Sequence, residues 1–515
     1  MTQAGLGDPP AWVADAVVYQ IFPDRFARSG RVPAPGPLED WLAPPTVNGF
    51  KGGDLYGIAE RLDHLVDLGI TAIYLNPIFS SASNHRYHTF DYLAVDPLLG
   101  GDEALRELLD AAHARGMRVV LDGVFNHASR GFWPFHHVME TGRYSPYRDW
   151  FHLHPEDLEA GRPLRAYPGD SLQEALTAEW AESHAAGSES LTTLGYRAWW
   201  DLPALPKLNT DNPIVREYLM GVAEHWTRFG IDGWRLDVPG EITSTGFWEE
   251  FRRRVRAINP EAWIVGEIWH ERGDLLDGST YDGLMNYPLA AAITSFVTGR
   301  HLDRRVVAQH SELQRQIRPL DGPRFVERLR DITEGYQPAF ARSMLGLLDS
   351  HDTPRFVSMA GDDVTSLRLG WLVLLSMPGA PCIYYGDEVG LRGEMDPGCR
   401  GALGWDESSW DRGLLETARA ITRLRHETAA FRDVDITPLA ALGMVAAYRR
   451  GSGAGATIVA VNAGEEDADL VVDLDAAGAD IVPIPGIVSG SIEAAADGRC
   501  LVRLPARSGT VIRLT

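Results

Sequence analysis

Between residues 16 and 426 the chain alternates between short apolar runs and longer segments with helical periodicity. Runs such as 16–22, 70–75 and 117–122 are rich in Val, Ile and Leu and almost uninterrupted by polar residues. Uninterrupted runs are typical of parallel strands that are buried on both faces. The same pattern predicts further strands at residues 231–237, 263–268, 282–286, 344–349 and 381–385.

The segments between these runs carry apolar residues every three or four positions, which predicts amphipathic helices. The predicted helices cover residues 57–68, 102–115, 213–229, 246–258, 364–376 and 411–426. Eight strands joined by helices predict an α/β fold, namely a (β/α)8 TIM barrel. Residues 128–208 lack this alternation and contain many aromatic residues, Pro and Gly. We interpret them as a long insertion after strand 3.

Near residue 437 the pattern changes to short β-rich runs separated by turn signals, at 444–448, 457–461, 469–473 and 510–514. This predicts a small C-terminal all-β domain of the sandwich type. The predicted domains are the first part of the catalytic barrel (1–127), the inserted domain (128–208), the second part of the barrel (209–433) and the C-terminal β-domain (434–515).

Charge and cysteine content disfavour several classes of function. The formal net charge is −23 and no basic run occurs, which disfavours nucleic acid, anionic membranes and polyanionic substrates as partners. The three cysteines are too few for a disulfide framework, and no CxxC motif is present to bind a metal. We find no signal peptide and no membrane-spanning run. We therefore expect a cytoplasmic protein that binds a neutral ligand.

Polar side chains gather where four of the predicted strands end. In such a barrel the chemistry lies at the carboxyl ends of the strands. Strands 3, 4, 5 and 7 end in the following residues: Asp122, Asn126 and His127; Arg235 and Asp237; Glu267 and Trp269; and Asp349, His351 and Asp352. Any one of them alone is more often a helix cap or a solvated charge, but their joint placement on one rim favours a site. Arg235 and Asp237 are two positions apart and should contact each other on one strand face.

Clustered carboxylates suit the cleavage of glycosidic bonds. One carboxylic acid protonates the leaving oxygen while another carboxylate faces the anomeric carbon. No GxxxxGK(S/T) motif and no GxGxxG after strand 1 is present, so nucleotide chemistry is not supported. Without Cys or a dense set of His residues, a catalytic zinc is disfavoured. The aromatic residues near the rim, Tyr87, Trp199, Trp200 and Trp269, suit the faces of sugar rings.

Four motifs resemble those of the α-amylase family of glycoside hydrolases. They are DGVFNH, GWRLDVPGE, GEIWH and DSHDTPR, in this order and on strands 3, 4, 5 and 7. The segment WWDLPALPKLN (199–209) resembles a signature of the subgroup of neopullulanases, cyclomaltodextrinases and maltogenic amylases. YQIFPDRF, SNHRYHTFDY and DPGCRGALGWD resemble the same subgroup. The resemblance covers nearly the whole chain.

The resemblance implies roles for individual residues. Asp237 would be the nucleophile, Glu267 the general acid/base, and Asp352 the group that binds sugar hydroxyls and stabilises the transition state. Arg235 would lower the pKa of Asp237 and keep this carboxylate charged. The other implied residues are Tyr87, His127, Lys207, Trp269, His351, Asp396 and Arg400 for substrate binding, with Asp122 and Asn126 as supporting residues.

The implied activity is the retaining hydrolysis of α-1,4 glucosidic bonds, with α-1,6 bonds as an alternative, in maltodextrins, cyclodextrins or pullulan. A 4-α-glucanotransferase or an α-glucosidase could use the same site, and products longer than the substrate would indicate transfer. A binding protein on a degenerate amylase barrel is a further alternative. Such a protein should lack at least one of the three carboxylates, and this chain carries all of them.

No cofactor is predicted. The loop after strand 1, DRFARSGRVPAPGPLED, lacks the calcium-binding cluster of Asp and Asn residues that many members of the family carry, so we predict no metal site, with calcium as the open alternative. The first strand begins near residue 16, which leaves no room for the N-terminal β-domain of the resembled subgroup. We therefore expect a monomer or a weak homo-oligomer.

Overall fold

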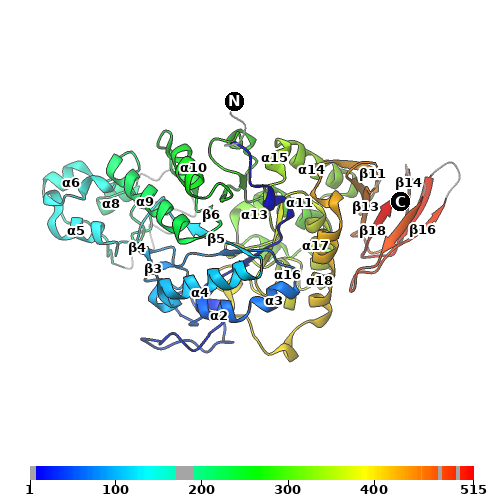
Figure 1. Ribbon diagram of the computed structural model, residues 1–515, viewed down its shortest axis with the longest axis horizontal. Coiled ribbons are helices and arrows are strands. Elements are labelled where there is room, and N and C mark those ends of the chain that lie inside the picture. The colour runs from blue at the N-terminus through cyan, green and yellow to red at the C-terminus, as the bar shows by residue number, and fades with distance from the viewer. Residues whose placement is uncertain (1–6, 170–188, 454, 474–477, 495–498, 515) are drawn as a thin grey trace.

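The computed structural model describes residues 7–169, 189–453, 455–473, 478–494 and 499–514. Eight parallel strands pair in the order β8-β7-β6-β5-β2-β1-β10-β9. They are β1 (Val18–Ile21), β2 (Ala72–Leu75), β5 (Arg118–Gly123), β6 (Gly233–Leu236), β7 (Trp263–Gly266), β8 (Gly283–Leu284), β9 (Leu345–Gly346) and β10 (Ala380–Tyr384). A parallel bridge between Met285 and Leu345 closes the sheet, which confirms the predicted (β/α)8 barrel (Figure 1).

The barrel strands are buried on both faces because two cores lie against them. A small cluster that includes Val18, Tyr74, Val120 and Trp263 fills the interior of the barrel. A much larger core lies between the strands and the surrounding helices. Every residue of β1, β2, β6 and β7 is buried, which explains why these segments show no polar alternation in the sequence.

The helices around the barrel follow the predicted segments closely. Their bounds are α2 (Leu55–Glu60), α3 (Leu62–Asp67), α4 (Gly101–Ala114), α9 (Pro213–Phe229), α10 (Phe247–Ile258), α17 (Val364–Ser376) and α18 (Arg412–Glu427). The predicted helix 57–68 is in fact two helices that meet at Arg61. The ends of α9 are clear in the sequence because Asn212 caps its first turn and Gly230 adopts the left-handed conformation after its last.

Several helices were not predicted. They are α1 (Pro23–Phe26), α11 (Tyr287–Val297), α12 (Arg304–Val307), α13 (Ser311–Gln316), α14 (Gly322–Glu334), α15 (Pro338–Ala341) and α16 (Phe356–Met359). In α11 every residue is buried, so this helix has no polar face and its sequence shows no amphipathic period. The antiparallel hairpin of β3 (Phe79–Ser81) and β4 (Thr89–Val95) was also missed.

Between β5 and β6 the chain leaves the barrel and forms a lobe at one end of the molecule (Figure 1). This lobe holds the short helices α5 (Trp133–Thr141), α6 (Pro155–Glu159) and α8 (Glu189–Leu194). An isolated bridge between His127 and Lys207 joins the two ends of the lobe, and a bridge between Phe151 and Leu208 joins its middle to its end. The insertion therefore follows the third barrel strand, as predicted.

At the opposite end of the molecule lies an all-β region, as predicted (Figure 1). Its strands are β11 (Ile436–Leu442), β12 (Val445–Arg450), β13 (Thr457–Asn462), β14 (Ala468–Asp473), β15 (Ala479–Val482), β16 (Ser491–Ala494), β17 (Arg499–Leu504) and β18 (Ser508–Leu514). They form two antiparallel sheets, β11-β12-β13-β18-β15 and β14-β17-β16. Apolar residues of both sheets, among them Ile458, Val472 and Val502, share a separate core.

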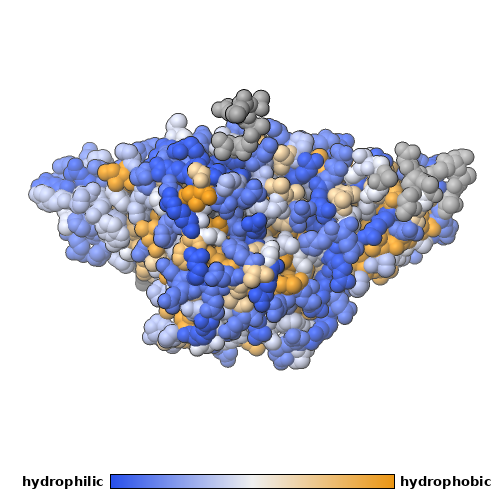
Figure 2. Space-filling view, viewed as in Figure 1, coloured by the Kyte–Doolittle hydropathy of each residue, from blue (hydrophilic) through white to orange (hydrophobic). Residues whose placement is uncertain are grey.

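The surface reflects the acidic composition. Most of the face in Figure 2 is hydrophilic, and apolar residues occupy small areas of it. The chain carries 71 Asp and Glu residues against 48 Lys and Arg residues. Within the described part of the chain, none of the helices has the length and apolar character needed to cross a membrane.

Candidate active site

One buried guanidinium contacts four carboxyl groups at the carboxyl end of the barrel. Arg235 Nη1 lies 3.0 Å from Asp122 Oδ1 and 3.1 Å from Asp237 Oδ1. Its other terminal nitrogen, Nη2, lies 3.0 Å from Glu267 Oε2 and 3.9 Å from Asp352 Oδ2. The Arg235 side chain is fully buried, and Asp352 is the most exposed of the four carboxylates. The three carboxylates of the predicted catalytic set therefore converge on one side chain.

Strand register explains why these groups meet. Asp122 of β5 and Arg235 of β6 are register partners on adjacent parallel strands, so their side chains point to the same side of the sheet. Asp237 follows Arg235 by two positions and shares its face, which confirms the predicted contact between them. Glu267 directly follows β7, the next strand of the barrel.

The backbone beside Asp237 is strained. Val238 has φ 37° and ψ 50°, which is the left-handed region that a β-branched residue normally avoids. This conformation costs about 1–2 kcal/mol. It directs the Val238 amide to donate a hydrogen bond of 3.1 Å to Glu267 Oε2. Strain of this kind is typical of functional sites, because the surrounding structure must enforce it.

The carboxyl cluster holds protons more strongly than isolated acids do. Burial is the largest cause that raises the pKa of Asp237 well above its ordinary value, and the neighbouring Glu267 raises it further. Burial and Glu267 also raise the pKa of Asp352 to about 7. Arg235 lowers the pKa of Asp237, but this one cation is shared by four acids, three of them buried. The expectation of a net lowered pKa for Asp237 is therefore wrong, and the protons belong to the cluster as a whole.

Neutral hydrogen-bonding groups lie against the cluster. The Tyr87 hydroxyl donates to Asp122 Oδ2 at 2.8 Å and lies 2.6 Å from His351 Nε2. The rings of Tyr87 and His351 are parallel, with centroids 5.4 Å apart. His351 Nε2 also lies 3.0 Å from Asp352 Oδ2. Burial lowers the pKa of His351 well below its usual range, so the imidazole is neutral. It therefore interacts with its neighbours through hydrogen bonds and not as a positive charge.

Three further residues of the site were missed in the sequence. Gln20, in β1, has its Nε2 2.8 Å from His351 Nδ1 and donates to Asn76 Oδ1 at 3.1 Å. Asn76 directly follows β2. Tyr74 donates to Asp122 Oδ2 at 2.7 Å. The signal for Gln20 and Asn76 was the same as for the acids, namely a polar residue at the end of an apolar strand.

The predicted pair of Asp396 and Arg400 lies beside this cluster. Arg400 Nη1 is 3.1 Å from Asp396 Oδ2, and Arg400 Nη2 is 3.6 Å from Asp352 Oδ1. The Nε of Arg400 donates to the backbone oxygen of His351 at 2.9 Å. Arg400 is therefore a second cation at the rim and partly balances Asp352, whose pKa it lowers against the effect of burial.

Other predicted residues have partners outside the carboxylate cluster. The His127 ring stacks on Trp199 at 4.8 Å, and its Nδ1 lies 3.4 Å from the amide nitrogen of Asn126. Burial lowers the pKa of His127 to about 3, so this imidazole is also neutral. Lys207 pairs with Glu241 at 3.2 Å.

Trp269 packs between two other rings. Tyr287 and His310 lie nearly parallel to it, with ring centroids at 3.7 Å and 4.7 Å. Its backbone oxygen accepts a hydrogen bond from Gln316. The Trp269 indole is therefore stacked against two rings of the protein itself.

A metal has few ligands to use here. Among the residues that the structure describes, no group of three or more His, Cys, Asp and Glu side chains could hold one. In the loop after β1 the buried ammonium group of Lys51 is held by three oxygen atoms of the chain. Lys51 Nζ donates to the backbone oxygens of Asp40 at 2.5 Å and Ala43 at 2.7 Å, and lies 3.3 Å from Glu39 Oε2.

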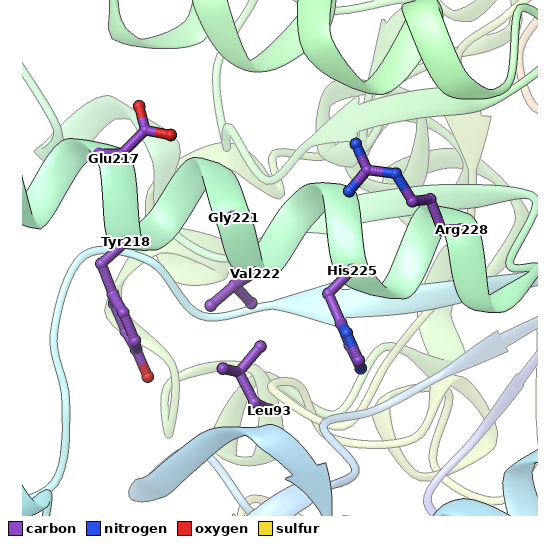
Figure 3. Close-up of a pocket in the computed structure, with 7 residues that line it drawn as sticks. All are labelled: Leu93, Glu217, Tyr218, Gly221, Val222, His225 and Arg228. Carbon is purple, nitrogen blue, oxygen red and sulfur yellow. The ribbon is translucent and has the colours of Figure 1, made fainter.

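A cavity of about 410 Å³ lies on the outer face of α9, away from the acids. In Figure 3, Tyr218, Val222 and His225 of α9 point toward Leu93 of β4, whereas Glu217 and Arg228 point to the other side of the helix. Its lining contains none of the rim carboxylates. The groups with perturbed pKa values converge at the barrel rim, so the chemistry belongs there.

Comparisons with known proteins agree with this geometry. Residues 20–440 match the family model of the alpha-amylase catalytic domain. A cyclomaltodextrinase from Bacillus sp is 41% identical over 426 residues, which is 82% of this chain and 68% of that protein. A solved structure from Thermus thermophilus has a TM-score of 0.85 and 45% identity, covering 98% of this chain and 100% of that one. The debranching enzyme from Nostoc punctiforme has a TM-score of 0.83 and 44% identity, covering 98% and 99%. The chain therefore belongs to the α-amylase family of glycoside hydrolases.

Proposed function

We propose that this chain is a retaining hydrolase of α-glucosidic bonds in neutral maltodextrins, including cyclic and branched ones. The main support for the proposal is that Asp237, Glu267 and Asp352 all lie within 4 Å of the Arg235 guanidinium. Two carboxyl groups close to one reacting carbon suit retention through a covalent intermediate. The similar cyclomaltodextrinase and debranching enzyme support cyclic and branched α-glucans as the substrate class.

In the proposed mechanism, Asp237 attacks the anomeric carbon while Glu267 donates a proton to the leaving glycosidic oxygen. The bond to the leaving sugar breaks as the bond to the Asp237 oxygen forms. Glu267, now a carboxylate, then takes a proton from water, and this water displaces Asp237 and restores both groups. Arg235 contacts both carboxyls and, together with the Val238 amide, fixes their orientation.

The raised pKa values of the cluster have a use in this mechanism. The first step requires one carboxyl that carries a proton and one that is ionised, side by side in the same site. Burial raises the pKa values of Asp237 and Asp352, so the cluster as a whole binds protons more readily than isolated carboxyl groups do, and Arg235 opposes this rise at Asp237. The remaining negative charge, including that of Asp352, stabilises the positive charge that develops on the sugar ring.

The proposal is tested with Asp237→Asn. This change should reduce the turnover of β-cyclodextrin and maltotriose by several orders of magnitude, because the amide is not a nucleophile. Asp387→Asn is a matched control, because Asp387 is another buried acid of the barrel that pairs with Arg355 at 2.7 Å and is not one of the four acids at Arg235. The control should lower stability but retain turnover. Near-normal turnover by Asp237→Asn would exclude Asp237 as the nucleophile, and products longer than maltotriose from the unmodified protein would indicate a transferase.

A further inference from the structure

A partly exposed histidine stacks on the tryptophan that lies next to the proposed acid. Trp269 follows Glu267 by two positions, and the ring of His310 lies nearly parallel to its indole, with centroids 4.7 Å apart. On the indole there also stacks the buried ring of Tyr287, which belongs to the core inside the barrel, at 3.7 Å. The three rings therefore form a row that begins in the barrel interior and ends at His310.

The segment that carries His310 is fixed to the rim on both sides. His310 directly precedes α13, and Gln316 at the end of this helix donates a hydrogen bond of 3.0 Å to the backbone oxygen of Trp269. The preceding residue, Gln309, accepts a hydrogen bond of 3.1 Å from the amide of Met395, which directly precedes the predicted aspartate–arginine pair of the rim. The histidine is therefore held between two segments that carry residues of the site.

The hydrogen bond at one nitrogen of His310 fixes the proton on the other nitrogen. Nδ1 accepts a hydrogen bond of 3.3 Å from the Leu313 amide and so caps α13. Burial lowers the pKa of His310 to about 4, so the ring is neutral and carries a single N–H, which must be at Nε2. Among the residues that the structure describes, none accepts a hydrogen bond from Nε2, and this atom reaches the surface. A donor is therefore available at the rim.

We propose that His310 binds the leaving glucosyl unit by donating a hydrogen bond from Nε2 to one of its hydroxyls. The inference rests on the proposed function, since it assumes that Glu267 protonates the leaving oxygen. The leaving unit must then lie on the Glu267 side of the cleaved bond, and His310 stacks on Trp269 at that side. A neutral imidazole suits a sugar hydroxyl, because neither group has to lose the hydration of an ion when the two pair.

The test compares kcat/KM for maltotriose with that for 4-nitrophenyl α-maltoside, followed by the release of glucose and of nitrophenol. Both substrates present a maltosyl unit to Asp237, but only maltotriose has a sugar as its leaving group. His310→Phe keeps a ring on Trp269 and removes the donor. The ratio of the two values should therefore fall roughly two- to tenfold, as expected for one hydrogen bond between neutral groups. An equal loss on both substrates, or no loss, would overturn the proposal.

Two further variants separate substrate binding from helix capping. His154→Phe is the matched control, because His154 caps α6 in the same way, with Nδ1 accepting a hydrogen bond of 3.4 Å from the Asp157 amide. This control should leave the ratio unchanged. His310→Asn can still cap α13, but its side chain ends one atom short of Nε2, so the ratio should fall as in His310→Phe. A ratio restored by Asn would show that only the cap matters and would overturn the proposal.

These results are distinguishable from a failure of the proposed function. The ratio is measured with Asp237 and Glu267 unchanged, so it does not depend on which carboxyl group is the nucleophile. If the unmodified protein cleaves neither substrate, the proposed function fails. Calorimetric titration of maltotriose into the unmodified protein and into His310→Phe then decides the role of His310. Weaker binding by the variant supports the proposal, and equal binding overturns it.

Discussion

Replacing Arg235 with Met removes the cation that three buried carboxyl groups and the partly exposed Asp352 share. Removing one partner of a buried ion pair costs about 3–5 kcal/mol, because the remaining charge is left unpaired in a poorly solvated place. Arg235 is within 3.1 Å of three carboxylates, and its side chain is 0% exposed, so solvent does not screen the loss. We expect Arg235→Met to lose about 3–5 kcal/mol of unfolding free energy at pH 8, a large share of the ~5–15 kcal/mol of a native protein.

The size of this loss should depend on pH. Burial already raises the pKa values of Asp122, Asp237 and Asp352, and removal of Arg235 raises them further. A carboxyl with a higher pKa in the folded than in the unfolded protein destabilises the fold as pH rises, because the unfolded chain releases the proton more easily. Below the ordinary carboxyl pKa of about 4 the acids are protonated in both states. The difference between Arg235→Met and the unmodified protein should therefore be small near pH 4 and grow through pH 7, the value near which Asp352 titrates.

Urea unfolding at pH 5 and pH 8, followed by tryptophan fluorescence, measures this difference without adding salt that would screen charges. Arg235→Lys is the matched control, because it keeps the positive charge. It loses the guanidinium group, whose two terminal nitrogens contact Asp237 and Glu267 separately. The control should lose less stability than Arg235→Met at pH 8. An equal loss for Arg235→Met at both pH values would refute the reasoning, since it would show that the carboxyl charges do not respond to Arg235.

Two other changes test features of the structure outside the acids. Val238→Gly removes the strain of a left-handed β-branched residue, so the unfolding free energy should change by no more than about 1 kcal/mol. Its kcat should nevertheless fall, because the amide that orients Glu267 is held less firmly; an unchanged kcat would contradict a positioning role. Lys51→Met removes the buried ammonium group that donates to the backbone oxygens of Asp40 and Ala43, and should lower the unfolding free energy by about 1–3 kcal/mol in total. The melting temperature of the unmodified protein should not change with a chelator, and a large decrease would reveal a bound metal.

The sequence was sufficient to predict the barrel and the convergence of its acids. Strands buried on both faces must be apolar along their whole length, so β1, β2, β5 and β6 stand out without any tertiary information. Parallel barrel strands all end at one rim, so polar residues at their ends must come close together. The contact of Arg235 with Asp237 followed from the two-residue period of a strand alone.

Other features depended on contacts between distant segments. Helix α11 was missed because neighbours cover every side of it, which removes the polar face that marks a helix in a sequence. The ring faces of Trp269 are covered by Tyr287 and His310, which come from segments far along the chain. No local pattern reveals that Val238 is left-handed, because the assembled site enforces that conformation.

Residue order thus determined which charged groups reach the rim, and only the tertiary structure decided their ionisation. An arginine next to an aspartate predicts a lowered pKa when the two are considered as a pair. In the folded barrel, however, Asp237 is buried and shares Arg235 with Asp122, Glu267 and Asp352, so its pKa is raised. The physical reason is that desolvation and the number of acids around one cation are properties of the packed protein and cannot be read from neighbouring residues.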